Sequence, residues 1–443
     1  MISRFMNSRS KTVTAAAVVL MASAGVSRLL GIVRDRLLAV EFGASADLDV
    51  YFAAFRIPDL LYAFLVSWGV AAVFLPLFSE RMAESKEKAW HFASNMLNVY
   101  AVGLGVFVLL GAIAMPALMK IVAPGFTEDQ QILAVALSRL MLLSPFFFAL
   151  SSVAAGVLHY FERFVAYALA PVLYNLGIIM GILFFVPSVG VWGLAYGVLL
   201  GAMLHFLIHV PSLFSVGFSW KPVFSFFDAS VQRALLLSIP RAIGGVAHHI
   251  NLIVVTALAS TLSVGSIAVF NFANNLQYVP VGIIGLPMAL AVFPVLSRSA
   301  VARDWKLFYK SLRATLWRVG IITLPLATGM FLFKETIVSI VLQGGEFTQA
   351  DTELTASILG IFILGMLFQG FIPVLVRAFF ALQDTKSPTI AGVLAVVLNI
   401  ALAILFLRVG WGIFGLPWAL VISGGFQMAL LSLLLIKKKA RVQ

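Results

Sequence analysis

The sequence predicts an all-α polytopic membrane protein, with two parallel repeats of six transmembrane helices placed around a central cavity. Three observations predict this class. Of the 443 residues, 62% are hydrophobic and 11% are charged, with a mean hydropathy of +1.05, whereas soluble domains carry about 25% charged residues. The apolar residues gather in runs long enough to cross a bilayer. The second half of the chain repeats short sequences of the first half.

The first span begins after a basic N-terminal stretch that resembles the start of a signal peptide. Ala22-Ser23-Ala24 has the small side chains of a cleavage site, but the apolar pattern continues to Val33 without a polar cleavage region, so we expect an uncleaved helix. In the second span, Pro58 should produce a kink because it removes the backbone donor to residue 54. The twelve predicted spans cover residues 13–41, 48–79, 89–120, 131–158, 166–187, 191–215, 231–261, 264–297, 307–342, 353–382, 388–408 and 412–436.

Lysine and arginine in the loops set the predicted orientation. With the N-terminus inside, the inner segments hold nineteen basic residues and the outer segments hold four, which are Arg36, Lys120, Lys334 and Arg408. This asymmetry follows the positive-inside rule, so we expect both termini in the cytoplasm. The same bias accounts for the net charge of +12. No basic stripe on a soluble face is visible, and nucleic-acid binding is therefore not expected.

Three local sequences recur in order at a spacing of about 220 residues. An even number of spans in each half makes the halves parallel repeats, as in several transporter folds. We therefore expect an N-terminal lobe over residues 1–218 and a C-terminal lobe over 219–443, joined by the cytoplasmic stretch 216–230. The recurring sequences are Val73–Ser79 with Ala291–Ser297, Gly125–Thr127 with Glu346–Thr348, and Gly190–Tyr196 with Gly412–Trp418.

Residues 27–59 place charged side chains inside apolar runs. At about 1.5 Å per helical residue, Arg28 lies roughly 22 Å beyond Val13, which is deep in a hydrocarbon core about 30 Å thick. An arginine at that depth costs on the order of 2.5–3.5 kcal/mol on insertion scales. The helix face that carries it should therefore turn toward a watery cavity or a partner charge.

The spacing of these charges leaves two interpretations open. Arg28 and Asp35 are seven residues apart and share a helix face, whereas Arg34 should point about 100° away from Asp35 on an ideal helix. Arg28, Arg34 and Arg56 could line a site for an anionic headgroup, because guanidinium forks suit phosphate oxygens.

The alternative is internal ion pairing that only locks two helices together. Arg28 would then pair with Asp35, and Arg56 would pair with Asp49, which is seven residues before it, or with Asp59.

The second half of the chain offers fewer candidates. Arg241, which follows Pro240, is a possible counterpart across the cavity, and the alternative is that it snorkels toward the cytoplasm. Asn275 belongs to a polar face of the eighth span that either binds substrate or forms interhelical hydrogen bonds. His248 and His249 are adjacent and diverge by about 100°, so they do not suit one metal ion.

No cofactor, metal site or enzymatic site is expected. The chain contains no cysteine, which excludes disulfides and thiolate metal sites. Nucleotide-binding loops, hydrolase triads and metal clusters are not apparent. The acids able to couple transport to a proton or sodium ion are Asp35, Asp49 and Asp59.

The first charged stretch resembles the MurJ/MviN family, the proposed lipid II flippases of the multidrug/oligosaccharidyl-lipid/polysaccharide exporter superfamily. The resemblance covers essentially the whole chain. The residues that carry it are Ser27-Arg28-Leu29-Leu30-Gly31, Arg34-Asp35, Phe42-Gly43-Ala44, Asp49, Phe55–Leu61, Ala123–Phe126, Ala170-Pro171 with Asn175, and Phe380–Pro388.

The resemblance implies a V-shaped two-lobe fold and alternating access to a cavity whose arginines hold the diphosphate of an undecaprenyl-linked peptidoglycan precursor. Arg28, Arg34, Asp35 and Asp49 match the family's functional positions. The chain departs from the family in having Asn275 where some members carry an arginine, and in having twelve predicted spans instead of the usual fourteen.

The resulting expectation is a lipid II flippase of the bacterial inner membrane, coupled to the membrane potential, a proton or sodium. Its partners would be the undecaprenyl-diphosphate-linked lipid, the bilayer and the cell-wall synthesis machinery. A flippase for another lipid-linked oligosaccharide is the first alternative. A drug/cation antiporter is the second, and the basic lining counts against it because such a protein needs acids in its cavity. A membrane scaffold would leave unpaired buried arginines unexplained.

Overall fold

The computed structural model describes residues 13–67 and 70–442, which form helices joined by short turns. This confirms the predicted all-α class. The chain packs as two compact units, and the change from one to the other falls inside helices. Unit 1 contains the residues up to Leu38 and then Ala46–Ile253, whereas unit 2 contains Ala39–Ser45 and the residues from Val254 onward.

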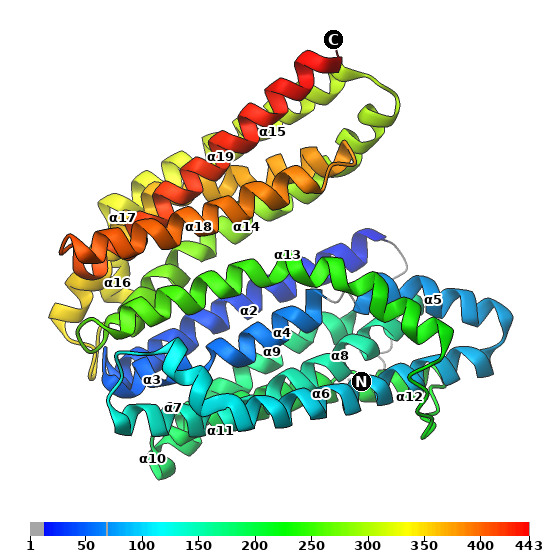
Figure 1. The fold of residues 1–443 in the computed structure, drawn as a ribbon, viewed down its shortest axis with the longest axis horizontal. Helices are drawn as coiled ribbons and strands as arrows, with labels where there is room; N and C mark the ends of the chain where they lie inside the picture. Colours follow the sequence, from blue (N-terminus) through cyan, green and yellow to red (C-terminus); the bar gives the residue numbers. More distant parts are fainter. Residues whose placement is uncertain (1–12, 68–69, 443) are drawn as a thin grey trace. The chain divides into compact units, whose positions relative to one another are not determined.

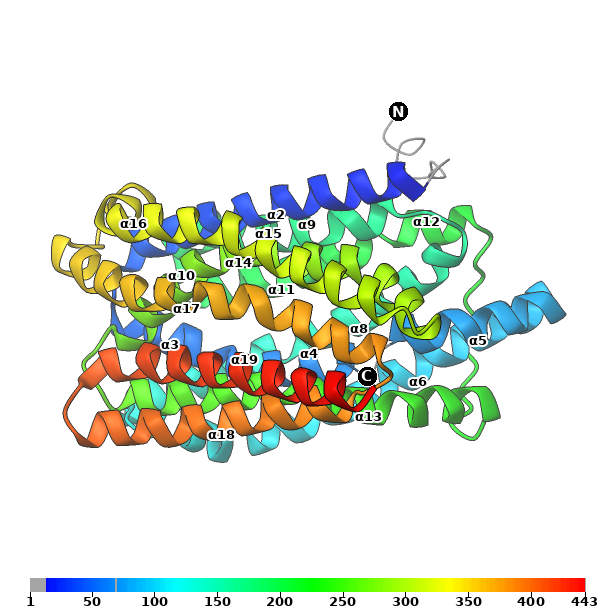
Figure 2. The same ribbon diagram turned by 90° about the horizontal axis from the view of Figure 1, so that it is seen from above.

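Unit 1 is built from a series of helices that pack side by side (Figures 1 and 2). Its elements are α2 (Val13–Phe42), α3 (Ala46–Ala54), α4 (Arg56–Ser67), α5 (Val70–Glu84), α6 (Lys86–Val122), α7 (Glu128–Met141), α8 (Leu143–Tyr160), α9 (Val165–Met180), the π-helical turn η1 (Gly181–Phe185), α10 (Val186–Val189), α11 (Trp192–Leu207), α12 (Val210–Ser215) and most of α13 (Ala229–Ser260).

Unit 2 consists mainly of five long helices. In it, α17 packs against α14, α15 and α19, and α18 packs against α19 (Figure 1). Its elements are α14 (Ser266–Val301), α15 (Trp305–Leu332), α16 (Lys334–Leu342), α17 (Gln349–Ala381), α18 (Lys386–Arg408), the 3₁₀ turn η2 (Gly412–Phe414) and α19 (Gly415–Val442).

Among the described residues, nine helical segments are long and apolar enough to cross a membrane. They coincide with nine of the predicted spans. The other three predicted spans, 13–41, 48–79 and 231–261, are occupied by α2, α3 to α5, and α13. The total of twelve spans and the lobe boundary at 218/219 stay predictions, because a packing unit in one conformation does not define a repeat.

Several predicted spans are interrupted helices. The second span breaks at Phe55, three residues before Pro58, where the expected kink becomes a helix end and a new helix start. Proline fits the first turn of a helix, where its missing N–H would have no helical partner. The fourth predicted span breaks in the same way at Leu142, before Pro145.

Each unit has its own apolar core. In unit 1, Phe74, Phe78 and Phe92 are buried and stack on one another, with ring centroids 5.3 and 5.4 Å apart. In unit 2, Phe308 and Phe379 lie in a cluster formed by α14, α15, α17 and α19. Many large apolar side chains outside these cores remain exposed, as expected for helices that face lipid.

The polar stretch after α12 is bound to α6 by side-chain hydrogen bonds. Asn95, which is fully buried, accepts from Ser225 N at 2.7 Å and donates to Ser225 O at 2.9 Å. Asn98 donates to Lys221 O and Val223 O, and it accepts from Trp220 Nε1. The stretch predicted to join the two lobes is therefore an ordered part of unit 1.

The C-terminal end of α2 packs in unit 2. Glu346 N donates to Val40 O at 2.9 Å. Gly43 and Gly345 have φ of +61° and +52°, and a Cβ at either would lie within 2.4 Å of the other segment's backbone. Both positions therefore require glycine, for its left-handed conformation and for the close approach.

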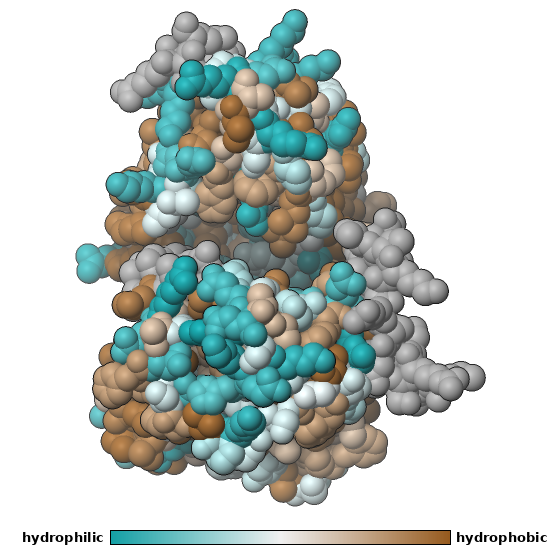
Figure 3. Space-filling model, turned by 90° about the vertical axis from the view of Figure 1, so that its right-hand side faces the viewer, coloured by the Kyte–Doolittle hydropathy of each residue, from teal (hydrophilic) through white to brown (hydrophobic). Residues whose placement is uncertain are grey.

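Hydrophilic side chains gather at one end of each unit (Figure 3). In unit 1 this end carries the α5–α6 turn, with Glu84 and Lys88, and in unit 2 it carries the turn between α14 and α15 (Figure 1). Both turns belong to the segments that we predict to be cytoplasmic.

Candidate functional site

The candidate site lies in unit 1, where polar groups of α2, α3, α4 and α9 come together among apolar helices. Its central group is Arg34 of α2. Arg34 Nε and Nη2 donate to Asp35 Oδ1 at 3.0 and 2.8 Å, and Nη1 donates to Asn175 Oδ1 at 3.3 Å. The side chains of Arg34 and Asp35 are 24% and 10% exposed, so the ion pair is largely shielded from solvent.

Asn175 connects α9 to α2. Its Nδ2 donates to Ser27 Oγ at 3.1 Å and lies 3.3 Å from Ser27 O. The same amide donates to Pro171 O one turn earlier in α9. Asn175 therefore orients the guanidinium of Arg34 with its oxygen and holds α2 with its nitrogen.

A second cation, Arg56, lies close to the first group. Arg56 begins α4 and is buried, and Asp59 of the same helix interacts electrostatically with both Arg56 and Arg34. Tyr51 of α3 and Tyr174 of α9 lie near Arg34. The structure thus groups two of the predicted arginines with two of the predicted acids.

The other predicted residues are placed as follows. Arg28 is half-buried in α2, and Asp49 is buried in the first turn of α3, where a carboxylate interacts favourably with the helix dipole. Asn275 is half-buried in α14 of unit 2. Arg241 belongs to α13, but its side chain lies outside the described residues.

The expectation that Arg34 points away from Asp35 is wrong. On an ideal helix the Cβ atoms of adjacent residues diverge, but an arginine side chain is long enough to fold back along the helix surface. In unit 1, the guanidinium of Arg34 is removed from water. The ion pair with Asp35 stabilises it more than an extended conformation among apolar neighbours would.

Sequence reasoning did not assign a site role to Asn175, Tyr51 or Tyr174. Asn175 and Arg34 are 141 residues apart in the chain, so no local pattern links them. The available signal was chemical: Asn175 is an amide in an apolar helix, and such a group needs a partner inside the bundle.

A second polar group of unit 1 lies beside a cavity of about 340 Å³. Ser151 Oγ lies 2.8 Å from His205 Nδ1 and 3.3 Å from His209 Nδ1. Tyr62, Ser151 and His205 line the cavity, and Tyr62 lies in α4, three residues after Asp59. The cavity therefore lies beside α4, the helix that begins with Arg56.

Gln277, on the polar face of α14, makes an interhelical contact. The amides of Gln277 and Gln369 exchange hydrogen bonds of 3.3 and 3.4 Å between α14 and α17. This supports the hydrogen-bonding interpretation for Gln277. In the part of the chain that the structure describes, no group of three His, Asp or Glu residues could hold a metal ion.

Comparison with known proteins decides the family. A family model described as lipid II flippase MurJ matches residues 38–443.

The chain belongs to the MurJ family.

Individual MurJ proteins match across most of the chain. A probable lipid II flippase MurJ from Rhizobium tropici is 31% identical over 392 residues, which cover 86% of this chain and 73% of that protein. One from Borreliella burgdorferi is 29% identical over 387 residues, covering 87% and 76%. Arg28, Arg34 and Asp35 precede the residues matched by the family model.

Solved structures support the two-lobe transporter fold of the MurJ family. A lipid II flippase MurJ in an inward closed conformation aligns with a TM-score of 0.82 and 26% identity, covering 96% of this chain and 90% of that one. An inward-facing multidrug MATE transporter aligns with a TM-score of 0.79 at 18% identity, covering 96% and 98%. At that identity the second match shows the shared fold alone. The predicted family and fold class are confirmed.

Proposed function

We propose that this MurJ-family protein is a lipid II flippase, which moves an undecaprenyl-diphosphate-linked peptidoglycan precursor from the cytoplasmic to the outer leaflet by alternating access. Family membership supports the substrate class and agrees with a transporter instead of an enzyme. The observation that carries the mechanism is the group of Arg34, Asp35 and Asn175, together with Arg56, among apolar helices.

Arg34 keeps capacity for an anion despite its ion pair. A guanidinium has five N–H donors. Asp35 takes two of them through one oxygen, and Asn175 takes a third at the long distance of 3.3 Å. Two donors remain, and the weak contact with Asn175 can be exchanged for a phosphate oxygen. Ion pairing and headgroup binding are therefore compatible at this residue.

The roles follow from charge and placement. Arg28, Arg34 and Arg56 engage the diphosphate, with Arg241 and Asn275 as second-lobe contributors. Asp35, Asp49 and Asp59 hold the arginines and take part in closing the outer gate. Because the arginines carry charge inside the membrane, their movement would respond to the membrane potential at about 2.3 kcal/mol per charge per 100 mV. Coupling to a proton or sodium through the same acids belongs to this proposal.

The location and partners are part of the same proposal. The chain is a multi-pass membrane protein. We place it in the bacterial inner membrane with both termini in the cytoplasm, where the precursor is made, and the cell-wall synthesis machinery is its expected partner.

The test replaces Arg34 with alanine in cells depleted of their native flippase and measures outer-leaflet lipid II. Removing one partner of a shielded charge contact should lower flipping by about tenfold or more at equal protein level. Arg36→Ala is the matched control, because this arginine lies two residues away on an exposed position. Undiminished flipping by Arg34→Ala would contradict the proposed mechanism.

Binding separates lipid II from the alternative substrate. Purified protein should bind lipid II more tightly than an undecaprenyl-diphosphate-linked polysaccharide unit. Equal binding would favour a flippase for lipid-linked oligosaccharides in general.

A further inference from the structure

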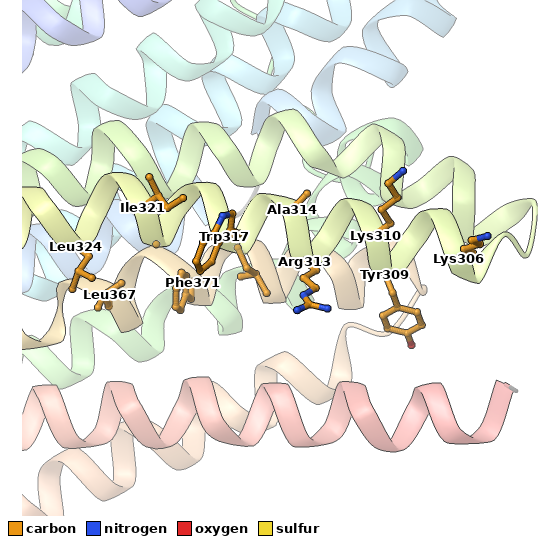
Figure 4. A pocket seen from close by; sticks show the side chains of 12 residues that line it. Lys306, Tyr309, Lys310, Arg313, Ala314, Trp317, Ile321, Leu324, Leu367 and Phe371 are labelled. Carbon is orange, nitrogen blue, oxygen red and sulfur yellow. The ribbon is translucent and has the colours of Figure 1, made fainter.

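Unit 2 carries a groove that the flippase mechanism does not use. It has a volume of about 1070 Å³ and lies along α15, with two residues from α17. One end is cationic, with Lys306, Lys310 and Arg313, and the rest is apolar. Figure 4 shows this gradation along a single helix. The apolar lining comes from Leu316, Trp317, Gly320, Ile321, Leu324, Leu367 and Phe371.

The three cations of the groove have no acidic partner in the part of the chain that the structure describes. Within the described residues, none of them forms an ion pair, and Lys306 lies in the first turn of α15, at the positive end of the helix dipole. Asp304, the nearest carboxylate in the chain, accepts from Leu307 N as the N-cap of the same helix. All three side chains are exposed, so an anionic headgroup at the membrane surface can reach them.

Several other cations of the described residues have partners within the chain. In unit 1, Arg81 and Lys88 pair with Glu84, and in unit 2, Lys438 pairs with Asp384. Arg377 lies over the rings of Phe293 and Phe380 at 5.4 and 5.7 Å. What distinguishes the groove is its geometry, because Lys306, Lys310 and Arg313 follow one another on a single face of α15 and border an apolar floor.

The dimensions of the groove fit one leaflet. From Arg313 to Leu324 the helix rises by roughly 16 Å at 1.5 Å per residue, close to half of a hydrocarbon core of about 30 Å. Gly320 adds no side chain to the floor, and a Cβ placed there would lie 3.5 Å from the ring of Phe371. Trp317 is 69% exposed and offers a flat apolar face beside this floor.

We propose that this groove binds an anionic glycerophospholipid of the cytoplasmic leaflet, with its phosphate on Lys306, Lys310 and Arg313 and an acyl chain over Gly320. Charge complementarity selects the headgroup, because phosphate is the anion found at this depth of the membrane. The apolar floor selects a lipid over a free anion. The site is separate from the arginine group of unit 1 and does not depend on the proposed transport function.

Native mass spectrometry of the purified full chain tests the site. The protein is incubated with a phosphatidylglycerol and a phosphatidylcholine of identical acyl chains, and the bound fractions are compared. Each basic residue at an anionic lipid surface contributes about fivefold in affinity. Replacing Lys306, Lys310 and Arg313 with glutamine should therefore lower the preference for phosphatidylglycerol by about fivefold or more.

Two control variants make the result specific. Arg298→Gln, Arg303→Gln and Lys386→Gln together remove the same charge from exposed positions outside the groove, and this triple variant should keep the preference. Gly320→Phe fills the floor without changing charge and should reduce retention of both lipids. An equal loss in the control triple variant, or full retention by the groove variants, would overturn the proposal.

A competition experiment identifies which molecule occupies the groove. Inorganic phosphate should not displace phosphatidylglycerol from the unmodified protein. Undecaprenyl diphosphate should not displace it either. If undecaprenyl diphosphate does displace it, and only when Gly320 is intact, the groove holds the transported lipid's tail and the phospholipid assignment is wrong.

Discussion

At the scale of single residues, Asp384 stabilises the turn between α17 and α18. Its carboxylate accepts from Ser387 N at 2.9 Å and Ser387 Oγ at 2.6 Å, and it pairs with Lys438 of α19. Partial burial opposes ionisation, but these contacts outweigh it and lower the pKa of Asp384 to about 2. One side chain thus fixes the start of α18 and holds α19 beside it.

Because the pKa of Asp384 is lowered in the folded protein, the stability that this residue contributes should depend on pH. A carboxylate whose pKa is lower in the folded state contributes stability above its unfolded value of about 3.9, and that stability is lost as the pH falls toward 2. Asp384→Asn should therefore be less stable than the unmodified protein at pH 6, by about 1 kcal/mol or less. The difference should shrink between pH 4 and pH 2, as measured by the thermal unfolding of the purified protein.

Lys438→Met is the companion variant. It removes the ion pair but leaves the hydrogen bonds from Ser387, so its effect should be smaller than that of Asp384→Asn. A difference that stays constant down to pH 2 would show that ionisation of Asp384 does not contribute to stability.

Single residues also show how far sequence reasoning extends to the site. The argument from buried charge singled out Arg34, Arg56, Asp35 and Asp59, which the structure brings together, because the cost of charge in an apolar run is a local property. Which partner each one takes depends on side-chain flexibility and on α9, which contributes Asn175 from far along the chain. The functional roles of these residues stay predictions.

At the scale of helices, the crossing of α9 and α11 depends on glycine. A Cβ at Gly177 would lie 2.3 Å from Gly201 Cα, and a Cβ at Gly201 would lie 2.4 Å from Tyr174 O. Small residues allow membrane helices to approach this closely. The contact also sets the position of α9, which carries Tyr174 and Asn175 into the candidate site.

The crossing predicts opposite effects for one chemical change at two positions. Gly201→Ala should destabilise the protein by about 1–3 kcal/mol, because the added methyl group meets backbone that must move. Gly103→Ala in α6 has open space around its Cβ, and it should be neutral or stabilising by up to about 1 kcal/mol. Thermal unfolding of both variants in detergent is the measurement. If the Gly201→Ala and Gly103→Ala variants melted at the same temperature, α9 and α11 could move apart without a loss of stability.

Helix positions were predictable because apolar runs and prolines act locally. The break at Phe55 follows from Pro58, and most helix ends lie close to those expected from the sequence. The π-helical turn at Gly181–Phe185 was not predicted, and it lies where Gly181 and Gly197 pack against each other. That contact is tertiary and leaves no periodic signal in the sequence.

At the scale of the whole molecule, the absence of cysteine makes the topology directly testable. Ala83 lies in a segment predicted to be cytoplasmic and Asp129 in one predicted to be external, and both residues are exposed. On intact spheroplasts, a membrane-impermeant maleimide should label Asp129→Cys and not Ala83→Cys, and both should react after lysis. The reverse pattern would invert the proposed orientation and place the termini outside.

Helix α2 contributes residues to both units. Residues up to Leu38 pack in unit 1, whereas Ala39–Ser45 pack in unit 2 against the loop that contains Glu346. Arg34 therefore lies about one helical turn from the point where α2 changes units. Any rotation of one unit must twist or bend the helix at that turn. A small molecule that stiffened the loop around Glu346 would then restrict this movement of α2 without occupying the space around Arg34.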